Sequence, residues 1–326
     1  MELIKIAEKK AKEGIALTRE EIISLLEIPL GSEEDIQLRK AAYEVSIYKT
    51  KGRAYIWSAV GADYAPCPMN CKFCSFGEEW GIIKEQVHYT KEQIINRAKQ
   101  FVNKGARFIV LRTTEFYSIP VLINLAKEMR KQVAGNYEIV FNTGEFDMTT
   151  ANLMVEAGVN GIYHACRLRE GKDTPFDPWE RKNTMNNVYR SGLKLISLVE
   201  PIGIEHTNEE IADNFLQILK HGAVISGAMA RVPVPGTPLG SIERISDERL
   251  AQIIAVLRLS GGDIVKDICV HPATPEAIQS GANIMVVETG AIPRDVHCEE
   301  DNWHGVDIEQ ARTLLENAGY NVYNHE

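Results

Sequence analysis

The feature that most constrains the fold is a repeated alternation of two hydrophobic patterns from residue 53 onward. Eight short runs rich in β-branched and aromatic residues are typical of strands. They cover residues 53–60, 107–113, 137–144, 160–166, 193–200, 223–234, 263–270 and 283–290. Stretches with helical periodicity lie between them, at residues 91–105, 119–133, 149–158, 185–192, 208–222 and 247–262. Strands that alternate with helices predict an α/β protein with a parallel sheet.

The number of strands and the length of 326 residues predict a (β/α)8 barrel of the TIM type with additional helices. Residues 1–50 have helical patterns, and we expect Ser32 to cap the helix that follows it. We therefore predict an N-terminal helical extension over residues 1–50 and one barrel domain over residues 51–326. An open doubly wound sheet is the alternative, but the chain lacks the G-x-G-x-x-G motif that marks many such sheets.

Charge and composition narrow the classes of partner. The formal net charge of −9 argues against nucleic acid or an anionic membrane surface, since both favour clustered Lys and Arg. The sequence contains neither a secretory signal nor an apolar run long enough to cross a membrane. We expect a soluble cytoplasmic protein, in which thiols stay reduced and a group of cysteines indicates metal binding or catalysis.

Three of the six cysteines lie within eight positions, in the segment YAPCPMNCKFCSFGEEW. Cys67, Cys71 and Cys74 have the spacing C-x3-C-x2-C and follow the first predicted strand, on the face where barrels carry their active sites. Three thiolates can hold a [4Fe–4S] cluster and leave one iron open to an outside ligand. A structural zinc site normally has four protein ligands. A zinc site completed by a distant histidine stays open as an alternative.

The C-x3-C-x2-C spacing, with Phe73 before the last cysteine, resembles the signature of the radical S-adenosylmethionine (SAM) superfamily. The resemblance implies that Cys67, Cys71 and Cys74 hold a [4Fe–4S] cluster whose open iron binds SAM. An electron then breaks the C5′–S bond of SAM and leaves a 5′-deoxyadenosyl radical, which the protein holds and shields. The expected partners are a small-molecule substrate and an electron donor such as ferredoxin or flavodoxin.

The chain from about residue 50 onward resembles the biotin synthase branch, which includes the maturases HydE and HmdB and methylornithine synthase. The resemblance assigns SAM or substrate contacts to Glu115 in LRTTE, Asn142 and Glu145 in NTGEF, Arg167, Arg169 and Glu170 in HACRLREG, Glu200, Ile202 and Gly203 in VEPIGIEHT, and Val232 in RVPVPGTPL. Glu115 is expected at the SAM amine, and the VEPIGIEHT backbone at adenine. A solvated charged turn is the alternative for residues 167–170.

Within this branch, HACRLREG, VEPIGIEHT and the closing ETGAIPRD are most similar to HmdB-type maturases of [Fe]-hydrogenase. Those proteins commonly carry the longer spacing C-x5-C-x2-C, from which this chain departs. We expect hydrogen abstraction from a small polar substrate in cofactor biosynthesis. Arginine binds carboxylates bidentately, and the predicted barrel mouth is polar, with Arg112, His164, Arg231 and His271 beside Asn142, Glu145 and Arg167.

The other three cysteines leave the reaction type open. Cys166, Cys269 and Cys298 could hold an auxiliary cluster, and a sulfur-inserting reaction of the biotin or lipoyl type would then follow. Buried thiols without metal are the alternative. His297, Cys298 and His304 could also form a small metal site, although a polar loop describes them as well. A non-catalytic metal-binding barrel that serves as a scaffold is the hypothesis from a different class.

Overall fold

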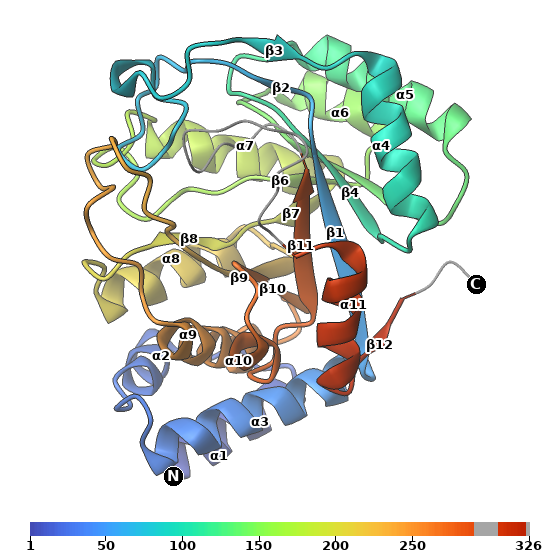
Figure 1. Ribbon diagram of the computed structural model, residues 1–326. Helices are drawn as coiled ribbons and strands as arrows, with labels where there is room; N and C mark the ends of the chain where they lie inside the picture. Colours follow the sequence, from blue (N-terminus) through green and yellow to red (C-terminus); the bar gives the residue numbers. More distant parts are fainter. Residues whose placement is uncertain (290–305, 324–326) are drawn as a thin grey trace.

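The computed structural model describes residues 1–289 and 306–323, and a closed parallel barrel stands at its centre (Figure 1). The barrel strands are β1 (Arg53–Gly61), β4 (Phe108–Arg112), β5 (Glu138–Asn142), β6 (Gly161–Tyr163), β7 (Lys194–Ile196), β8 (Val199–Ile202), β9 (Ile225–Ala230), β10 (Asp267–His271) and β11 (Ile284–Thr289). Neighbours pair in parallel around the ring, and the β9–β10 and β11–β1 pairs close it. The predicted (β/α)8 barrel is confirmed, and the open sheet is wrong.

One predicted strand is divided. The run at 193–200 forms β7 and β8, with Ser197 and Leu198 between them, and the register of β8 against β9 is irregular between Val199 and Ile202. Both pieces pair with β9, so together they occupy one position of the eight-membered ring. The irregularity has no signal in the hydrophobic pattern, which runs through both pieces.

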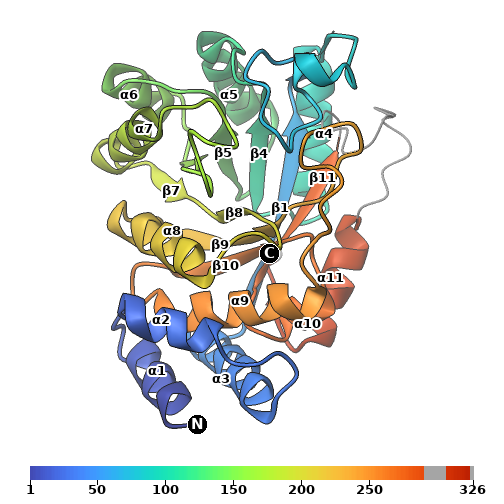
Figure 2. The ribbon, with the colours of Figure 1, turned by 90° about the vertical axis from the view of Figure 1, so that its left-hand side faces the viewer.

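Helices surround the barrel on its outside (Figure 2). They are α4 (Lys91–Asn103), α5 (Ile119–Gln132), α6 (Met148–Glu156), α7 (Pro178–Ser191), α8 (Asn208–Lys220), α9 (Asp247–Ser260), α10 (Pro275–Ile278) and α11 (Ile308–Asn317). Helix α7 begins seven residues before the predicted 185–192. The reason is local, because the Asp177 side chain accepts from Trp179 N–H and Pro178 occupies the first helical position.

The N-terminal segment forms α1 (Glu2–Lys12), α2 (Arg19–Leu26) and α3 (Glu33–Thr50), which lie at one end of the molecule (Figure 1). Ser32 caps α3 as expected, since its Oγ accepts from Asp35 N–H at 3.1 Å. Helix α3 packs along α9. The division of the chain at residue 50 stays a prediction.

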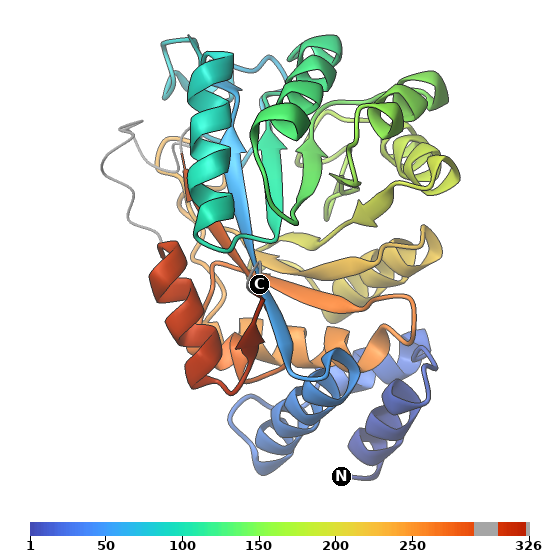
Figure 3. The ribbon, with the colours of Figure 1, turned by 90° about the vertical axis from the view of Figure 1, so that its right-hand side faces the viewer.

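Helices α10 and α11 and four smaller elements were not predicted. Strand β12 (Asn321–Val322) pairs with β1, and Figure 3 shows it beside the blue strand. Strands β2 (Asp63–Tyr64) and β3 (Val87–His88) form an antiparallel pair above the barrel, and the short 3-10 helix η1 (Glu78–Trp80) lies between them in sequence. This pair brackets the cysteine segment and closes it into a defined loop.

The apolar core has two parts. The larger part fills the space between the barrel strands and the surrounding helices. The smaller part lies inside the barrel and includes Trp57, Phe108, Val140, Ile196 and Ile284. These inner residues fill the lower half of the barrel, and the upper half is left for a cavity at the carboxyl ends of the strands. No helix of the described ranges is long and apolar enough to cross a membrane.

Candidate functional site

The three cysteines lie in a loop between β2 and η1 that is fixed by its own backbone. Cys67 N–H donates to Phe76 O at 2.6 Å, and Cys74 N–H donates to Cys71 O at 2.9 Å. Asn70 has a φ of 45°, in the left-handed region that asparagine tolerates. These bonds fold the C-x3-C-x2-C segment back on itself, so all three cysteines face the same side.

That side is the outer of two adjoining cavities at the barrel mouth. The outer cavity is lined by the three cysteines together with residues that follow β4, β5 and β6, including Glu115, Asn142, Thr143, His164, Arg167, Phe176 and Arg181. The cysteines are free thiols. Burial raises the pKa of the Cys71 thiol to about 12, although the nearby Arg167 acts to lower it.

Arg181 is the residue of this cavity that sequence reasoning missed. It lies in the first turn of α7 with a side chain only 3% exposed. Its guanidinium lies 2.7 Å from Glu145, 3.5 Å from Glu115 and 3.9 Å from Glu170, and it stacks 3.6 Å from the centre of the Phe176 ring. The segment WERKN reads as an ordinary polar helix face. The usable signal was helical spacing, because Arg181 shares the buried face of α7 with Thr184, Met185 and Val188.

Glu145 is held by three polar neighbours, His164, Arg181 and Thr184. Burial alone would raise the pKa of Glu145, but His164, Arg181 and Thr184 outweigh it and lower that pKa to about 2. His164 Nε2 lies 3.3 Å from Glu145 Oε2, and the Thr184 hydroxyl donates to the same oxygen. Glu145 is therefore ionised at neutral pH and holds Arg181 in place.

The inner cavity lies deeper, within the barrel, and has a volume of about 250 Å³. Its lower wall is apolar and consists of Trp57, Ala59, Val110, Leu198, Met229 and Val286, with the Cys269 thiol among them. Its upper wall is a ring of polar residues one step further along the strands: Arg112, Asn142, Tyr163, Glu200, Arg231, His271 and Glu288. Such a cavity fits a small molecule with an apolar body and polar groups at one end.

Most charges of this ring are paired between different strands, and Arg112 on β4 meets Glu288 on β11 across the intervening strand β1. Arg112 Nη1 lies 2.9 Å from Glu288 Oε1, and His271 Nε2 lies 3.9 Å from the other Glu288 oxygen. On the opposite wall, Tyr163 donates to Glu200, which lies 3.7 Å from Arg167.

Glu200 is almost completely buried, and burial raises its pKa above the usual range. The two cavities share Cys74, Asn142, Tyr163 and Arg167, so these residues form the boundary between them.

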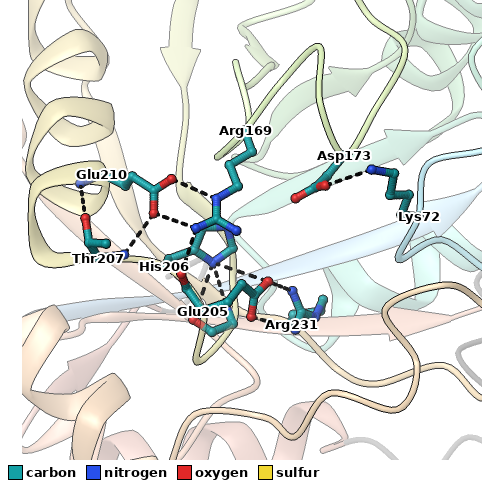
Figure 4. A network of polar contacts seen from close by, with 9 residues as sticks. Lys72, Arg169, Asp173, Glu205, His206, Thr207, Glu210 and Arg231 are labelled. Atoms are coloured by element: carbon teal, nitrogen blue, oxygen red, sulfur yellow. Dashed lines mark hydrogen bonds and ion pairs between the residues drawn. The ribbon is translucent and has the colours of Figure 1, made fainter.

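A polar network holds the outer rim of the barrel (Figure 4). Arg231 Nη2 donates to Glu205 at 2.9 Å, and Arg169 donates to Glu210 at 2.7 Å and to the Glu205 carbonyl at 2.7 Å. His206 Nδ1 accepts from Gly203 N–H at 2.9 Å. The loops after β6 and β8 are thereby joined to each other and to the end of β9.

The structure brings most of the predicted site residues together. Those that line a cavity are Cys67, Cys71, Cys74, Glu115, Asn142, Arg167, Glu200 and Val232. Glu145 and Glu170 lie directly behind the lining, against Arg181. The predicted mouth residues Arg112, His164, Arg231 and His271 also line one or the other cavity.

Three predicted contacts lie elsewhere. Arg169 turns away from both cavities and pairs with Glu210 in the rim network. The Ile202 side chain is buried in the outer core, and its carbonyl accepts from Arg231 N–H at 2.8 Å. The Gly203 N–H donates to His206. The backbone groups that the resemblance assigns to adenine are therefore already engaged within the chain.

The donor set of the outer cavity fits an iron–sulfur cluster with a SAM molecule beside it. Three free thiols face it, and four buried polar atoms of its lining lack a hydrogen-bond partner among the described residues: Thr143 Oγ1, His164 Nε2, Arg167 Nη1 and Arg181 Nε. Guanidinium and hydroxyl groups suit the carboxylate and ammonium of an amino-acid moiety. Within residues 1–289 and 306–323, no three His, Cys, Asp or Glu side chains surround a single metal-ion position.

The two other cysteines in the part of the chain that the structure describes, Cys166 and Cys269, lie in different parts of the core. Cys269 is fully buried and lines the inner cavity, whereas Cys166 lies in the core between the barrel and its helices. The Asn214 side chain donates to the Cys166 carbonyl at 2.8 Å, which ties this position to α8. Cys298, His297 and His304, like most of ETGAIPRD, lie outside the described residues.

The sequence is similar to the radical SAM superfamily and to biotin synthases. Residues 65–166 match the sequence model described as the radical SAM superfamily. Biotin synthase of Acetivibrio thermocellus is 24% identical over 268 residues, covering 79% of this chain and 82% of that protein. Biotin synthase of Brachyspira hyodysenteriae is 24% identical over 333 residues, covering 96% of this chain and 93% of that protein.

Solved structures share the fold. Methylornithine synthase (PylB) superposes with a TM-score of 0.81 at 18% identity, over 98% of both chains. HydG, described as a maturase of the [FeFe]-hydrogenase, superposes with a TM-score of 0.80 at 15% identity, over 98% of this chain and 76% of the other. At these identities the likeness establishes the barrel with its helices and nothing finer.

Proposed function

We propose that this chain, which belongs to the radical SAM superfamily of enzymes, reductively cleaves SAM and directs the resulting radical at a small polar substrate inside the barrel. The superfamily's cofactors are a [4Fe–4S] cluster and SAM. When bound, the cluster supplies the electron that turns SAM into a source of the 5′-deoxyadenosyl radical. Cys67, Cys71 and Cys74 would hold the cluster.

One observation carries the proposal: the cysteine cavity and the inner cavity share a wall made of Cys74, Asn142, Tyr163 and Arg167. A substrate in the inner cavity would therefore lie next to a cofactor in the outer one. Both cavities are recessed in the barrel mouth, which limits the access of water to a reactive intermediate. Arg181, with Glu115 and Glu145, would orient the amino-acid end of SAM.

The experiment is anaerobic reconstitution with iron and sulfide, followed by SAM and a strong reductant. The wild-type chain is expected to bind about four irons and to release 5′-deoxyadenosine. Cys71→Ala should lose both the cluster and the cleavage, and Cys166→Ala is the matched control that should keep both. Zinc in place of iron, or a loaded wild type that leaves SAM intact, would support the scaffold hypothesis instead.

The walls of the inner cavity indicate the kind of substrate that it would hold. Its apolar lower half and its ring of Arg112, Arg231, His271, Glu200 and Glu288 suit a small molecule with an apolar body and charged groups at one end. Hydrogen abstraction in cofactor biosynthesis, with ferredoxin or flavodoxin as cytoplasmic electron donor, fits this cavity. A role in maturing the [Fe]-hydrogenase cofactor rests on the HmdB-type motifs alone.

Sulfur insertion is the second candidate, because Cys269 lines the inner cavity where an auxiliary cluster would have to lie. Cys166 is too remote to contribute, since it lies in the outer core. Iron counting on Cys71→Ala separates the two candidates: about four irons left after loss of the triad would favour sulfur insertion, and none would favour hydrogen abstraction.

A further inference from the structure

Lys72, inside the C-x3-C-x2-C loop, is bound through every polar group that it has. Its N–H donates to Asp173 O at 3.0 Å, and its carbonyl accepts from Leu239 N–H at 3.0 Å. Its ammonium donates to Lys172 O at 2.8 Å and to the Asp173 carboxylate at 3.2 Å (Figure 4). Lys72 follows Cys71 directly and lies two residues before Cys74, so these bonds act at the centre of the cysteine loop.

The partner of Lys72 is itself held firmly. Asp173 is 8% exposed and lies in the loop between β6 and α7. Its N–H donates to Arg169 O at 3.0 Å, and Arg169, with a φ of 54°, is fixed by its two bonds to Glu210. The loop after β6 is therefore a fixed anchor for the cysteine loop.

A third loop completes the attachment. Leu239 belongs to the segment between β9 and α9, which crosses the barrel mouth. Gly240 follows it, and a side chain at this position would overlap the Val234 carbonyl, so the turn that presents Leu239 N–H is tight. Loops after three different barrel positions thus converge on one residue.

This attachment matters because three thiols must converge before a cluster can form. A loop that is ordered in advance does not lose conformational entropy when its cysteines bind iron. The Lys72 side chain is 43% exposed, so the charges of its ion pair with Asp173 contribute only modestly to the stability of the loop. The remaining contribution comes from the hydrogen bonds of Lys72, which fix the position of the loop.

We propose, given the function proposed above, that Lys72 and Asp173 are positioning residues that hold the cysteine loop in its cluster-binding form. A positioning role and a purely electrostatic role predict different effects when the charge of Lys72 or of Asp173 is removed. Loss of the Lys72 charge should lower the midpoint potential of a nearby cluster, and loss of the Asp173 charge should raise it. Positioning makes both losses change cluster retention in the same direction.

The test compares Lys72→Met, Lys72→Arg, Asp173→Asn and the Lys72→Met/Asp173→Asn double variant after anaerobic reconstitution. The rate of iron release to a chelator is measured on each, together with the midpoint potential. Both single neutral variants are expected to release iron about fivefold faster, which corresponds to about 1 kcal/mol. The double variant should be no faster than the worse single variant, because the two residues act as one unit. Lys72→Arg should recover much of the loss.

Lys172→Met is the matched control, because this neighbouring lysine offers only its carbonyl to the contact and its side chain is exposed. Thermal melting of the cluster-free chains identifies any variant that merely fails to fold. Unchanged iron release in both single variants, or effects that add in the double variant, would overturn the positioning role. A wild type that takes up no cluster would contradict the proposed function instead, so the two failures are distinguishable.

Discussion

The guanidinium of Arg181 lies 2.7 Å from the carboxylate of Glu145 at the barrel mouth, where Arg181 is buried and Glu145 is partly buried. This contact joins helix α7 to the segment that follows β5. Because Arg181 also faces Glu115 and Glu170, one buried cation contacts three carboxylates drawn from three strand ends, and Arg167 is a second cation beside Glu170. Charged contacts thus hold the side chains at the barrel mouth in place, whereas apolar packing holds the side chains inside the barrel beneath it.

Replacement of Arg181 should therefore be severe. Arg181→Met leaves three carboxylates without their shared cation, and removal of one partner from a buried ionic group costs about 3–5 kcal/mol. We expect a loss of this order in the free energy of unfolding, measured by urea denaturation near pH 7. Arg190→Met, on the exposed side of the same helix, is the control and should change little. Equal losses in the two variants would show that the carboxylate cluster contributes nothing.

Glu145 should make the free energy of unfolding depend on pH in the acid range. Its folded-state pKa of about 2 lies below the ordinary value of 4.5, so ionisation of Glu145 stabilises the fold above about pH 4.5. That contribution, on the order of 2 kcal/mol, should disappear as the pH falls towards 2. Denaturation of wild type and Glu145→Gln near pH 7 and near pH 3 measures it. The difference should shrink at the lower pH; a constant difference would reject the assignment, and exposed Glu156→Gln gives the baseline.

Tyr163→Phe should also have a smaller effect at lower pH, but for a different carboxylate. The substitution removes the hydroxyl that donates to Glu200, a carboxylate whose pKa is already raised by burial. We expect a loss of about 2 kcal/mol near pH 8, because a buried charge is left with a weaker partner. The loss should decrease as the pH falls towards the ordinary glutamate value and Glu200 takes up a proton. Tyr137→Phe is the control, since Tyr137 donates to a carbonyl at 3.2 Å and its loss should not vary with pH.

A substitution of Gly227 tests whether the pairing of β9 with β10, which closes the barrel, tolerates a side chain. It has a φ of 150°, and a side chain there would overlap the Cys269 carbonyl on the neighbouring strand β10. Gly227→Ala should cost about 3 kcal/mol or more, as measured by urea denaturation. Gly192→Ala also meets a positive φ but has open space around it, so its cost should stay near 1 kcal/mol. Similar costs at the two sites would mean that the barrel relaxes around Gly227.

The architecture was predictable because it rests on local patterns, and the site was predictable only in part. Period-two runs and glycine-ended helices are visible in the sequence, and so is the cysteine spacing. Arg181 was missed because two of its carboxylate partners are distant in sequence, and only folding brings Glu115 and Glu145 to α7. Arg169 was predicted to contact SAM or substrate but lies in the rim network, because a charged residue after a strand can face either the cavity or the rim. The choice depends on Glu210, which lies on another helix.

Cys269 decides which chemistry the inner cavity supports. Its thiol is fully buried among Ile225, Ile284 and Val286, and burial raises its pKa well above the ordinary value. A second cluster needs several protein ligands, and among the described residues the inner cavity offers Cys269 as its one cysteine outside the triad. We therefore expect Cys269→Ala to keep about four irons per chain and to form 5′-deoxyadenosine at the wild-type rate. Loss of additional iron and sulfide in this variant, with SAM cleavage unchanged, would instead identify Cys269 as a ligand of a second cluster.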